Sequence, residues 1–295
     1  MVSLRVVPAG VACLVLLCGC GGGSRPVSGS PEPTRTRSGS KAPAPSVSKA
    51  PVVRVPAGVR ASYVVFDRAA GRVVLERQAS RTYRSASVVK ILIALDYMDR
   101  HRVSAADRKL LVPMLRSSDD GAATEFWRRG GQKAIIERMV RRVGLRDTAA
   151  PPAEKPGFWG YTALSARDVV AMYRYLLDEA PKAQREFVLE QLRHSTPCGT
   201  DGFDQTFGIP GALKRPWAVK QGWSGFGETP AEPCRKGAQG VAWRPDLGLG
   251  RPVLHTTGIV GDEIVVVLTL HPAGSSFRTA AARITKLTGQ VYRAA

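Results

Sequence analysis

A serine and a lysine at helical spacing, Ser87 and Lys90, are the residues whose types most directly suggest chemistry. Residues three apart lie on one face of a helix, and the apolar run that follows, residues 91–95, predicts a helix that buries this face. A buried lysine amine can serve as the base that activates a serine hydroxyl. The same spacing recurs at residues 38–41 and 46–49, so on its own the pair fits a helix-capping serine beside a surface lysine at least as well.

Two further motifs follow Ser87 in a definite order. Ser118-Asp119-Asp120 lies between two helical patterns, and Lys220-Gln221-Gly222 lies at the end of a predicted strand. Together the three motifs resemble the S-x-x-K, S-D-N and K-T-G signature of the penicillin-recognising serine hydrolases, which include class A β-lactamases and D-alanyl-D-alanine peptidases. The resemblance covers about residues 57–295. It implies an α/β fold of the β-lactamase/transpeptidase-like type, with an antiparallel sheet flanked by helices and an inserted all-helical domain.

The resemblance also implies a catalytic role for each matched residue. Ser87 would be the acylated nucleophile, and Lys90 the base that activates it. Ser118 would relay the proton to the leaving nitrogen, and Lys220 would hold the substrate carboxylate and help to keep Lys90 deprotonated. The backbone N–H groups of Ser87 and Trp223 would form the oxyanion hole. The alternatives are that Ser118 merely caps the next helix and that Lys220 is an exposed strand lysine.

Two positions depart from the pattern of the family. Asp120 stands where the family has Asn, so a carboxylate that only accepts when ionised replaces an amide that also donates. Asp120 could therefore pair with Lys90 and oppose its action as a base. Gln221 replaces a hydroxyl residue, although its amide can still donate to a substrate carboxylate. With Gly222 and Trp223, these two residues are the expected substrate-binding positions.

The segment that would supply a deacylation base, residues 146–162, lacks the Glu-x-x-Leu-Asn pattern of class A β-lactamases. Its only glutamate, Glu154, lies in a Pro-rich context beside Lys155, where it could be a solvated loop charge or a substitute base. Without a positioned base, an acyl-enzyme persists. We therefore expect a peptidase-like or slow enzyme rather than an efficient β-lactamase.

Other catalytic patterns are missing from the sequence. There is no Gly-x-Ser-x-Gly motif, so a classical Ser-His catalytic triad lacks support in the sequence. The four histidines form no His-x-x-x-His pair, so a zincin-type zinc site lacks support as well. His255 lies on a predicted strand and could be either at the edge of the site or in the core. No cofactor and no metal are expected.

The elements that must position these residues change type along the chain. Strand patterns come first, helical patterns follow, and strand patterns return, which predicts a sheet domain (residues 57–83 and 196–295) split by a helical part (about 84–195). The predicted strands cover 62–66, 72–77, 217–221, 253–260 and 264–270. The predicted helices cover 86–99, a segment opened by the capping box of Ser104 and Asp107, 132–143, 165–178, 182–192 and 276–291.

The first 56 residues predict export and tethering. Arg5 precedes the apolar run 11–17, which is too short to span a bilayer but suits a signal peptide, residues 1–20. The run Leu17-Cys18-Gly19-Cys20 resembles a bacterial lipobox, which implies cleavage before Cys20 and attachment of a diacylglyceryl group to it. An ordinary cleaved signal would instead leave the protein free. Residues 21–56 are rich in Gly, Ser and Pro and predict a disordered, flexible stalk.

The composition and net charge limit the kinds of molecule that this protein is expected to bind. A hydrophobic content of 44% argues against wholesale disorder of the chain. The net charge is +19. In an exported protein that charge suits anionic lipid headgroups or wall polymers better than nucleic acid, although scattered surface solvation would also explain it. Cys198 and Cys234 lie in loop-like contexts, and in an oxidising compartment we expect them to form a disulfide.

These observations converge on one hypothesis and one rival. The hypothesis is an exported, lipid-anchored protein that transfers acyl groups through a serine and acts on peptidoglycan peptides or β-lactams. The rival is a non-catalytic, wall-binding lipoprotein that keeps the same fold.

Overall fold

An antiparallel sheet of five strands organises the part of the chain that the computed structural model describes, residues 52–227, 229–234 and 251–295. The predicted signal peptide, the lipidation of Cys20 and nearly all of the predicted stalk lie outside these residues. The strand order is β2-β1-β7-β6-β5, and neighbouring strands run antiparallel. The strands are β1 (Arg60–Asp67), β2 (Arg72–Arg77), β5 (Trp217–Ser224), β6 (Val253–Val260) and β7 (Glu263–Leu270).

Each face of the sheet packs against its own hydrophobic cluster. Successive side chains of a strand point to opposite faces. Thus Val64 and Phe66 of β1 join the cluster shared with most of the helices, whereas Tyr63 and Val65 join the cluster under the C-terminal helix. This alternation fixes the register of the strands and therefore the face on which Lys220 lies.

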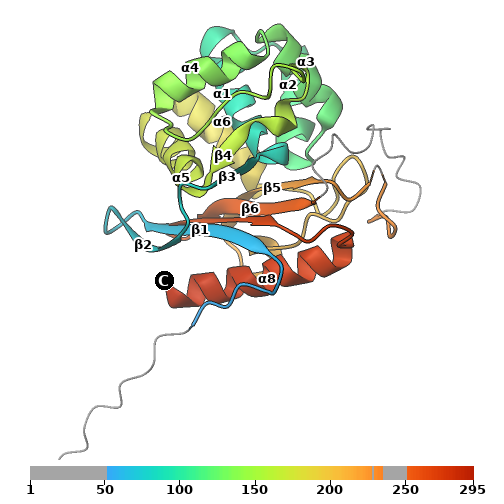
Figure 1. The fold of residues 1–295 in the computed structure, drawn as a ribbon. Helices are drawn as coiled ribbons and strands as arrows, with labels where there is room; N and C mark the ends of the chain where they lie inside the picture. The colour runs from blue at the N-terminus through green and yellow to red at the C-terminus, as the bar shows by residue number, and fades with distance from the viewer. Residues whose placement is uncertain (1–51, 228, 235–250) are drawn as a thin grey trace, which may run out of the picture. The chain divides into compact units, whose positions relative to one another are not determined.

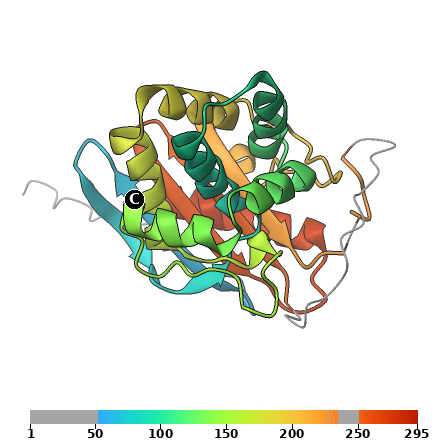
Figure 2. The same ribbon diagram turned by 90° about the horizontal axis from the view of Figure 1, so that it is seen from above.

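The helices form two layers, one on each side of the sheet. Figure 1 shows α1 to α6 above the sheet and α8 across its other face, and Figure 2 shows the upper layer from above. The upper helices are α1 (Lys90–Arg100), α2 (Ala105–Arg116), α3 (Asp120–Arg129), α4 (Lys133–Val143), α5 (Ala166–Arg174) and α6 (Lys182–Arg193). The remaining helices are η1 (Ala86–Val89), η2 (Trp159–Tyr161), η3 (Tyr175–Glu179), α7 (Ile209–Ala212) and α8 (Phe277–Ala294).

The strands, helices and strands follow one another as the sequence predicts. The capping box of α2 is present, since Ser104 Oγ accepts from Asp107 N and Asp107 Oδ2 accepts from Ser104 N. The helix α4 ends at Gly144, whose φ of +73° is left-handed. A pair of short strands, β3 (Thr82–Arg84) and β4 (Ala163–Ser165), was not predicted, because three residues are too few to show an alternating pattern.

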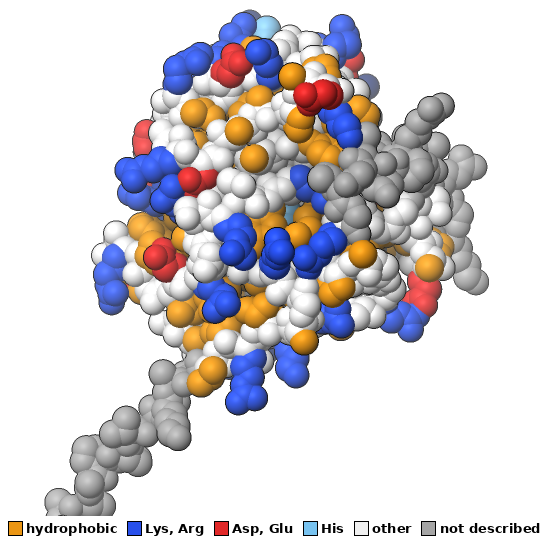
Figure 3. Space-filling model, viewed as in Figure 1, with side chains coloured by type: hydrophobic (Ala, Val, Ile, Leu, Met, Phe, Trp, Pro, Cys, Tyr) orange, Lys and Arg blue, Asp and Glu red, His pale blue; other side chains and the backbone are white. Residues whose placement is uncertain are grey.

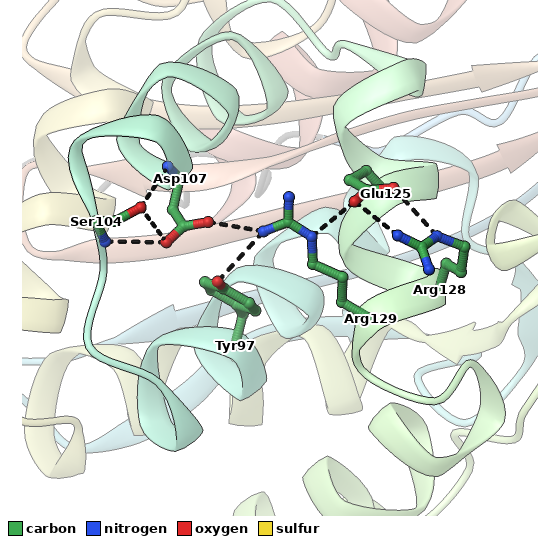
Figure 4. Close-up of polar contacts among 6 residues, drawn as sticks. All are labelled: Tyr97, Ser104, Asp107, Glu125, Arg128 and Arg129. Atoms are coloured by element: carbon green, nitrogen blue, oxygen red, sulfur yellow. Dashed lines mark hydrogen bonds and ion pairs between the residues drawn. The ribbon is translucent and has the colours of Figure 1, made fainter.

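Helix α1 is the centre of the helical layer. Its side chains from Lys90 to Tyr97 are all buried, so neighbouring helices surround it. A polar network of α1, α2 and α3 holds this packing together (Figure 4). Arg129 donates to Tyr97 Oη at 3.4 Å, to Asp107 Oδ1 at 2.8 Å and to Glu125 Oε1 at 2.7 Å. The three helices are thereby fixed relative to one another, and with them the start of α1 and the start of α3.

Asp107 gives this network a pH dependence. The hydroxyl of Ser104, and further hydrogen bonds from Tyr97 and Arg129, lower the pKa of Asp107 from 3.8 to about 2. A carboxyl group with a lowered pKa stabilises the fold above its unfolded pKa, and this stabilisation is lost as the pH falls through the folded value.

We predict that Asp107→Asn lowers the free energy of unfolding at pH 7 by on the order of 1 kcal/mol, because the variant loses the ionic hydrogen bond to Arg129, which is itself partly exposed and screened by solvent. The difference between wild type and variant should shrink as the pH is lowered from about 4 toward about 2. Urea unfolding at several pH values measures it, with Asp178→Asn, an exposed carboxylate elsewhere in the helical layer, as the control. A difference that is constant down to the lowest pH would contradict this role of Asp107.

Candidate functional site

A cavity of about 160 Å³ opens beside Ser87, where the helical layer meets the edge of the sheet. Its walls come from η1, from Asp120 and Thr124 of α3, from residues 157–161, from the loop 200–203 and from the end of β5 with the residues up to 227. Ser87 is only 5% exposed, and its hydroxyl forms no hydrogen bond with any described residue. The hydroxyl is therefore available to a ligand in the cavity.

The backbone around Ser87 is held tightly. Ala86 has a φ of +45°, which is unusual for a residue with a side chain and turns the chain into the short helix η1. Strand β5 presses against this turn at Gly222, where a Cβ would lie 3.1 Å from Ser85 O and 3.3 Å from Ser87 N. A larger residue at position 222 would have to push these backbone atoms away by a few tenths of an ångström. The close approach places the strand backbone beside the N–H of Ser87, which the predicted oxyanion hole needs.

Lys90 is paired with Asp120. Its amine is fully buried and donates to Asp120 Oδ1 at 2.5 Å and to Ser118 O at 2.6 Å. The amine also lies 4.5 Å from the centre of the Trp159 ring. The described residues contain no hydrogen bond between Lys90 and Ser87. The pairing that the sequence suggested for Asp120 is present, and the ammonium group in this salt bridge cannot accept the Ser87 proton.

Ser118 joins Lys90 to a second buried lysine. Lys220, which is 1% exposed, donates to Ser118 Oγ, and Ser118 Oγ donates to Gln205 Oε1 at 3.3 Å. Burial, and then the charge of Lys90, lower the pKa of Lys220 well below its ordinary value. Lys220 bonds to Ser118 Oγ, and neither residue is among those that line the cavity. The position of Lys220 therefore suits proton exchange with Ser118 more than contact with a substrate carboxylate.

The residues after Lys220 differ in whether they reach the cavity. Gln221 is not among the residues that line it, and its amide donates to Phe207 O at 2.5 Å and to Gln205 O at 3.3 Å. Gln221 therefore does not line the cavity, although the sequence analysis expected it to contact a substrate carboxylate. Trp223 does line the cavity, and its indole N–H donates to Asp201 Oδ2 at 2.9 Å.

Sequence reasoning missed Asp201, Gln205 and Trp159. Asp201 lies in a loop after α6, where Phe203 N also donates to its Oδ1 at 3.2 Å, and burial raises the pKa of its carboxyl group. Gln205 is held by donation of its amide to Arg116 O and Thr196 O. None of the three belongs to a motif, so the only sequence signal was the Gly-Thr-Asp-Gly run that follows a loop cysteine.

The two other candidates of the sequence lie elsewhere. Glu154 is exposed, and within the described residues the carboxylates that line the cavity are those of Asp120 and Asp201. His255 is a core histidine. Its Nδ1 accepts from Thr269 N at 3.2 Å, so its Nε2–H donates to Arg84 O at 2.9 Å, and burial lowers its pKa to about 4.

A disulfide joins two walls of the cavity. Cys198 and Cys234 are bonded, with their Cα atoms 5.7 Å apart. Cys234 N also donates to Gly202 O at 2.8 Å. The bond ties the loop that carries Asp201 to the segment that follows β5, so both walls share one covalent support.

This chain is similar to curated proteins and to solved structures. No protein-family model matches the chain. “Putative lipoprotein LppW” of Mycobacterium tuberculosis and of Mycobacterium bovis is 37% identical over 248 residues, which is 80% of this chain and 70% of the relative. Among solved structures, a class A β-lactamase from Mycobacterium abscessus superposes with a TM-score of 0.57 at 17% identity, over 80% of this chain and 94% of the other. The penicillin-binding protein PBP-A gives 0.57 at 14% identity, over 82% and 92%.

We predict that the disulfide stabilises the domain. In the chain-entropy view, closing a loop of this length contributes about 4 kcal/mol, less if the native state is strained. The double variant Cys198→Ser, Cys234→Ser should therefore melt at a clearly lower temperature than the oxidised wild type, and reductant should lower the wild-type melting temperature but not that of the variant. Two free thiols in protein taken from its native compartment would contradict this prediction.

Proposed function

This chain belongs to the family of the mycobacterial lipoprotein LppW and has the fold of the penicillin-recognising serine hydrolases, and on that premise we propose that it is an exported serine acyl-transfer protein. It acts on β-lactams or peptidoglycan peptides. The reaction forms an acyl-Ser87 intermediate that is made slowly and released slowly.

The observation that carries this proposal is the convergence of the three motifs. Ser87 lies at the cavity with a hydroxyl that has no partner among the described residues. Lys90 bonds to Ser118 O, and Lys220 bonds to Ser118 Oγ, so residues from three distant stretches of the chain meet at one site. A nucleophile, two amines and a relay hydroxyl are the groups that acyl transfer to serine needs.

Acylation follows from these groups. Ser87 Oγ attacks the amide carbonyl carbon, the carbon–nitrogen bond breaks, and the hydroxyl proton reaches the leaving nitrogen through Ser118. The amine that accepts the Ser87 proton must first be neutral. Because Lys90 is bonded to Asp120, its extra proton has to pass to that carboxylate before the amine can act. This additional step makes acylation slow.

Release of the acyl group needs a base that positions water. The resemblance to class A β-lactamases would give this role to a glutamate. Glu154 of this chain, however, is exposed and is not among the residues that line the cavity. Of the two cavity carboxylates, Asp120 is paired with Lys90, and Asp201 accepts hydrogen bonds from Trp223 and from the backbone of Phe203. These contacts support a long-lived acyl-enzyme.

A non-catalytic binding protein is the second candidate. The ion pair between Lys90 and Asp120 favours it, because a lysine held as an ammonium leaves Ser87 without a base. In this case the cavity would bind wall peptides and release them unchanged.

Intact-mass spectrometry decides between the two candidates. The protein is incubated with penicillin G, with which a solved form of PBP-A makes an acyl-enzyme complex. The proposal expects one adduct per chain, located on Ser87, absent from Ser87→Ala and persistent after removal of excess drug. No adduct with penicillins and cephalosporins of differing side chains would favour the binding protein.

We predict that Asp120→Asn accelerates acylation about tenfold, which corresponds to roughly 1.4 kcal/mol of activation free energy. The variant removes the carboxylate that holds Lys90 as an ammonium and restores a donor for the substrate. Deacylation should stay slow. Single-turnover kinetics with a chromogenic cephalosporin measure both steps, and melting temperatures verify that the variant is folded. Slower acylation in Asp120→Asn, or rapid multiple turnover by the wild type, would show that this role of Asp120 is wrong.

We further propose that the protein is anchored to the outer face of the cell membrane through a lipid on Cys20. The lipoprotein name of LppW supports this location. Within the described residues, no helix is long and apolar enough to cross a membrane. Figure 3 shows Lys and Arg side chains spread over one face of the domain, with a row across its middle and few Asp or Glu among them. Such a surface suits anionic headgroups or wall polymers.

Cys20→Ala should release the protein from the membrane fraction or stop its processing, because the thiol that takes the lipid is gone. Cys18→Ala is the matched control and should fractionate like the wild type. Immunoblots of membrane and soluble fractions give the result. If wild type and Cys20→Ala distribute alike, the anchor does not lie at this cysteine.

A further inference from the structure

Asp201 is an acid without a cationic partner in a basic protein. Its carboxylate lines the cavity and accepts from Trp223 and from the backbone of Phe203, but it forms no salt bridge with any described residue. Both of its neutral hydrogen bonds leave further lone pairs on each oxygen. The chain has 43 Lys and Arg, yet none of the described lining residues is basic. Asp201 is therefore not in direct contact with any described cation, although the charge of Lys90 acts on it from a distance.

Aromatic rings surround the same space. The lining includes Phe158, Trp159, Tyr161, Phe203, Trp223 and Phe226. The faces of aromatic rings attract cations, and more strongly where water is excluded. An unpaired carboxylate among such rings is the chemistry that binds an ammonium group and disfavours an anion.

Two features show that this wall is held in place. A Cβ at Gly199 would lie 2.5 Å from Asp201 Oδ1 and 2.9 Å from Trp223 Cζ2, so a glycine is required for the acid and the indole to meet. The disulfide of Cys198 and Cys234 closes the same loop. The second independent sign of a ligand is Ser87, which is 95% buried, lines the same cavity and has no hydrogen-bond partner among the described residues.

We infer that the ligand of this cavity carries a cationic amino group, which Asp201 and the surrounding rings bind while the ligand's carbonyl group lies at Ser87. The inference rests on the proposed function in taking the cavity as the ligand site, and it names the substrate class as amine-bearing acyl compounds. It does not depend on whether Ser87 completes the chemistry, since the amine is bound before any bond is broken.

A matched pair of β-lactams tests the inference. Ampicillin and penicillin G share the ring system and its carboxylate and differ by one side-chain amino group. Intact-mass kinetics give the ratio of their acylation rates for wild type and for Asp201→Asn. We expect this ratio to fall about tenfold in Asp201→Asn, because the amine loses its ionic partner, and to stay at the wild-type value in Asp178→Asn. The wild-type ratio should also fall at high salt. A ratio that Asp201→Asn leaves unchanged would overturn the inference.

A second arm separates this inference from the proposed function. If neither drug forms an adduct, the acyl-transfer proposal fails, and binding is then measured without chemistry. The probes are Nα-acetyl-lysine amide and its uncharged counterpart Nα-acetyl-norleucine amide, titrated by tryptophan fluorescence into Ser87→Ala and into Ser87→Ala, Asp201→Asn. Tighter binding of the lysine compound that is lost with Asp201→Asn supports the inference. Equal binding of the two probes, or no binding of either, overturns it.

The variant Gly199→Ala keeps the carboxylate of Asp201 and changes only where that carboxylate lies. The new methyl group would displace Asp201 or Trp223. We expect it to lower the preference for ampicillin as Asp201→Asn does. A structural effect alone would slow both drugs equally and leave their ratio unchanged.

Discussion

Two buried lysine amines that bond to one serine, Lys90 to the carbonyl oxygen and Lys220 to the hydroxyl of Ser118, are the constraint on which the rest of this structure depends. Burial disfavours the charged form of an amine, and a like charge close by disfavours it further. The chain resolves the conflict unequally. Lys90 receives a carboxylate partner in Asp120, whereas burial and the charge of Lys90 lower the pKa of Lys220. Ser118 therefore lies between an ammonium and an amine that readily gives up its proton.

The fold supplies the burial that this arrangement requires. Helix α1 begins at Lys90 and runs through the centre of the helical layer, so nothing but protein surrounds its first turn. Strand β5 brings Lys220 from the sheet, and Gly222 lets that strand touch the backbone of Ser87. The cavity opens the site toward solvent on the side where Asp120 and Asp201 lie. The charges that a ligand meets there are thus acidic, although the protein as a whole is basic.

Much of this could be predicted from the sequence, because motif order and hydrophobic periodicity are local signals. The hairpin of β1 and β2, the capping box of α2 and the pairing of Asp120 with Lys90 all follow from residue types at fixed spacing. Asp201 and Gln205 could not be found in this way. They lie in an irregular loop whose path is set by contacts with distant parts of the chain, such as Trp223 and Arg116.

The protonation of Lys220 is the most direct test of this account. Lysine side chains labelled with ¹³C at Cε report the loss of the ammonium proton by NMR as the pH is raised, and Lys220→Met and Lys220→Arg identify the resonance of Lys220. The account predicts that Lys220 has a pKa well below that of the surface lysines, whose ordinary pKa is about 10.4. Its resonance should therefore shift at a lower pH than the surface-lysine resonances. Titration of Lys220 together with the surface lysines would contradict the unequal pair on which the proposed chemistry depends.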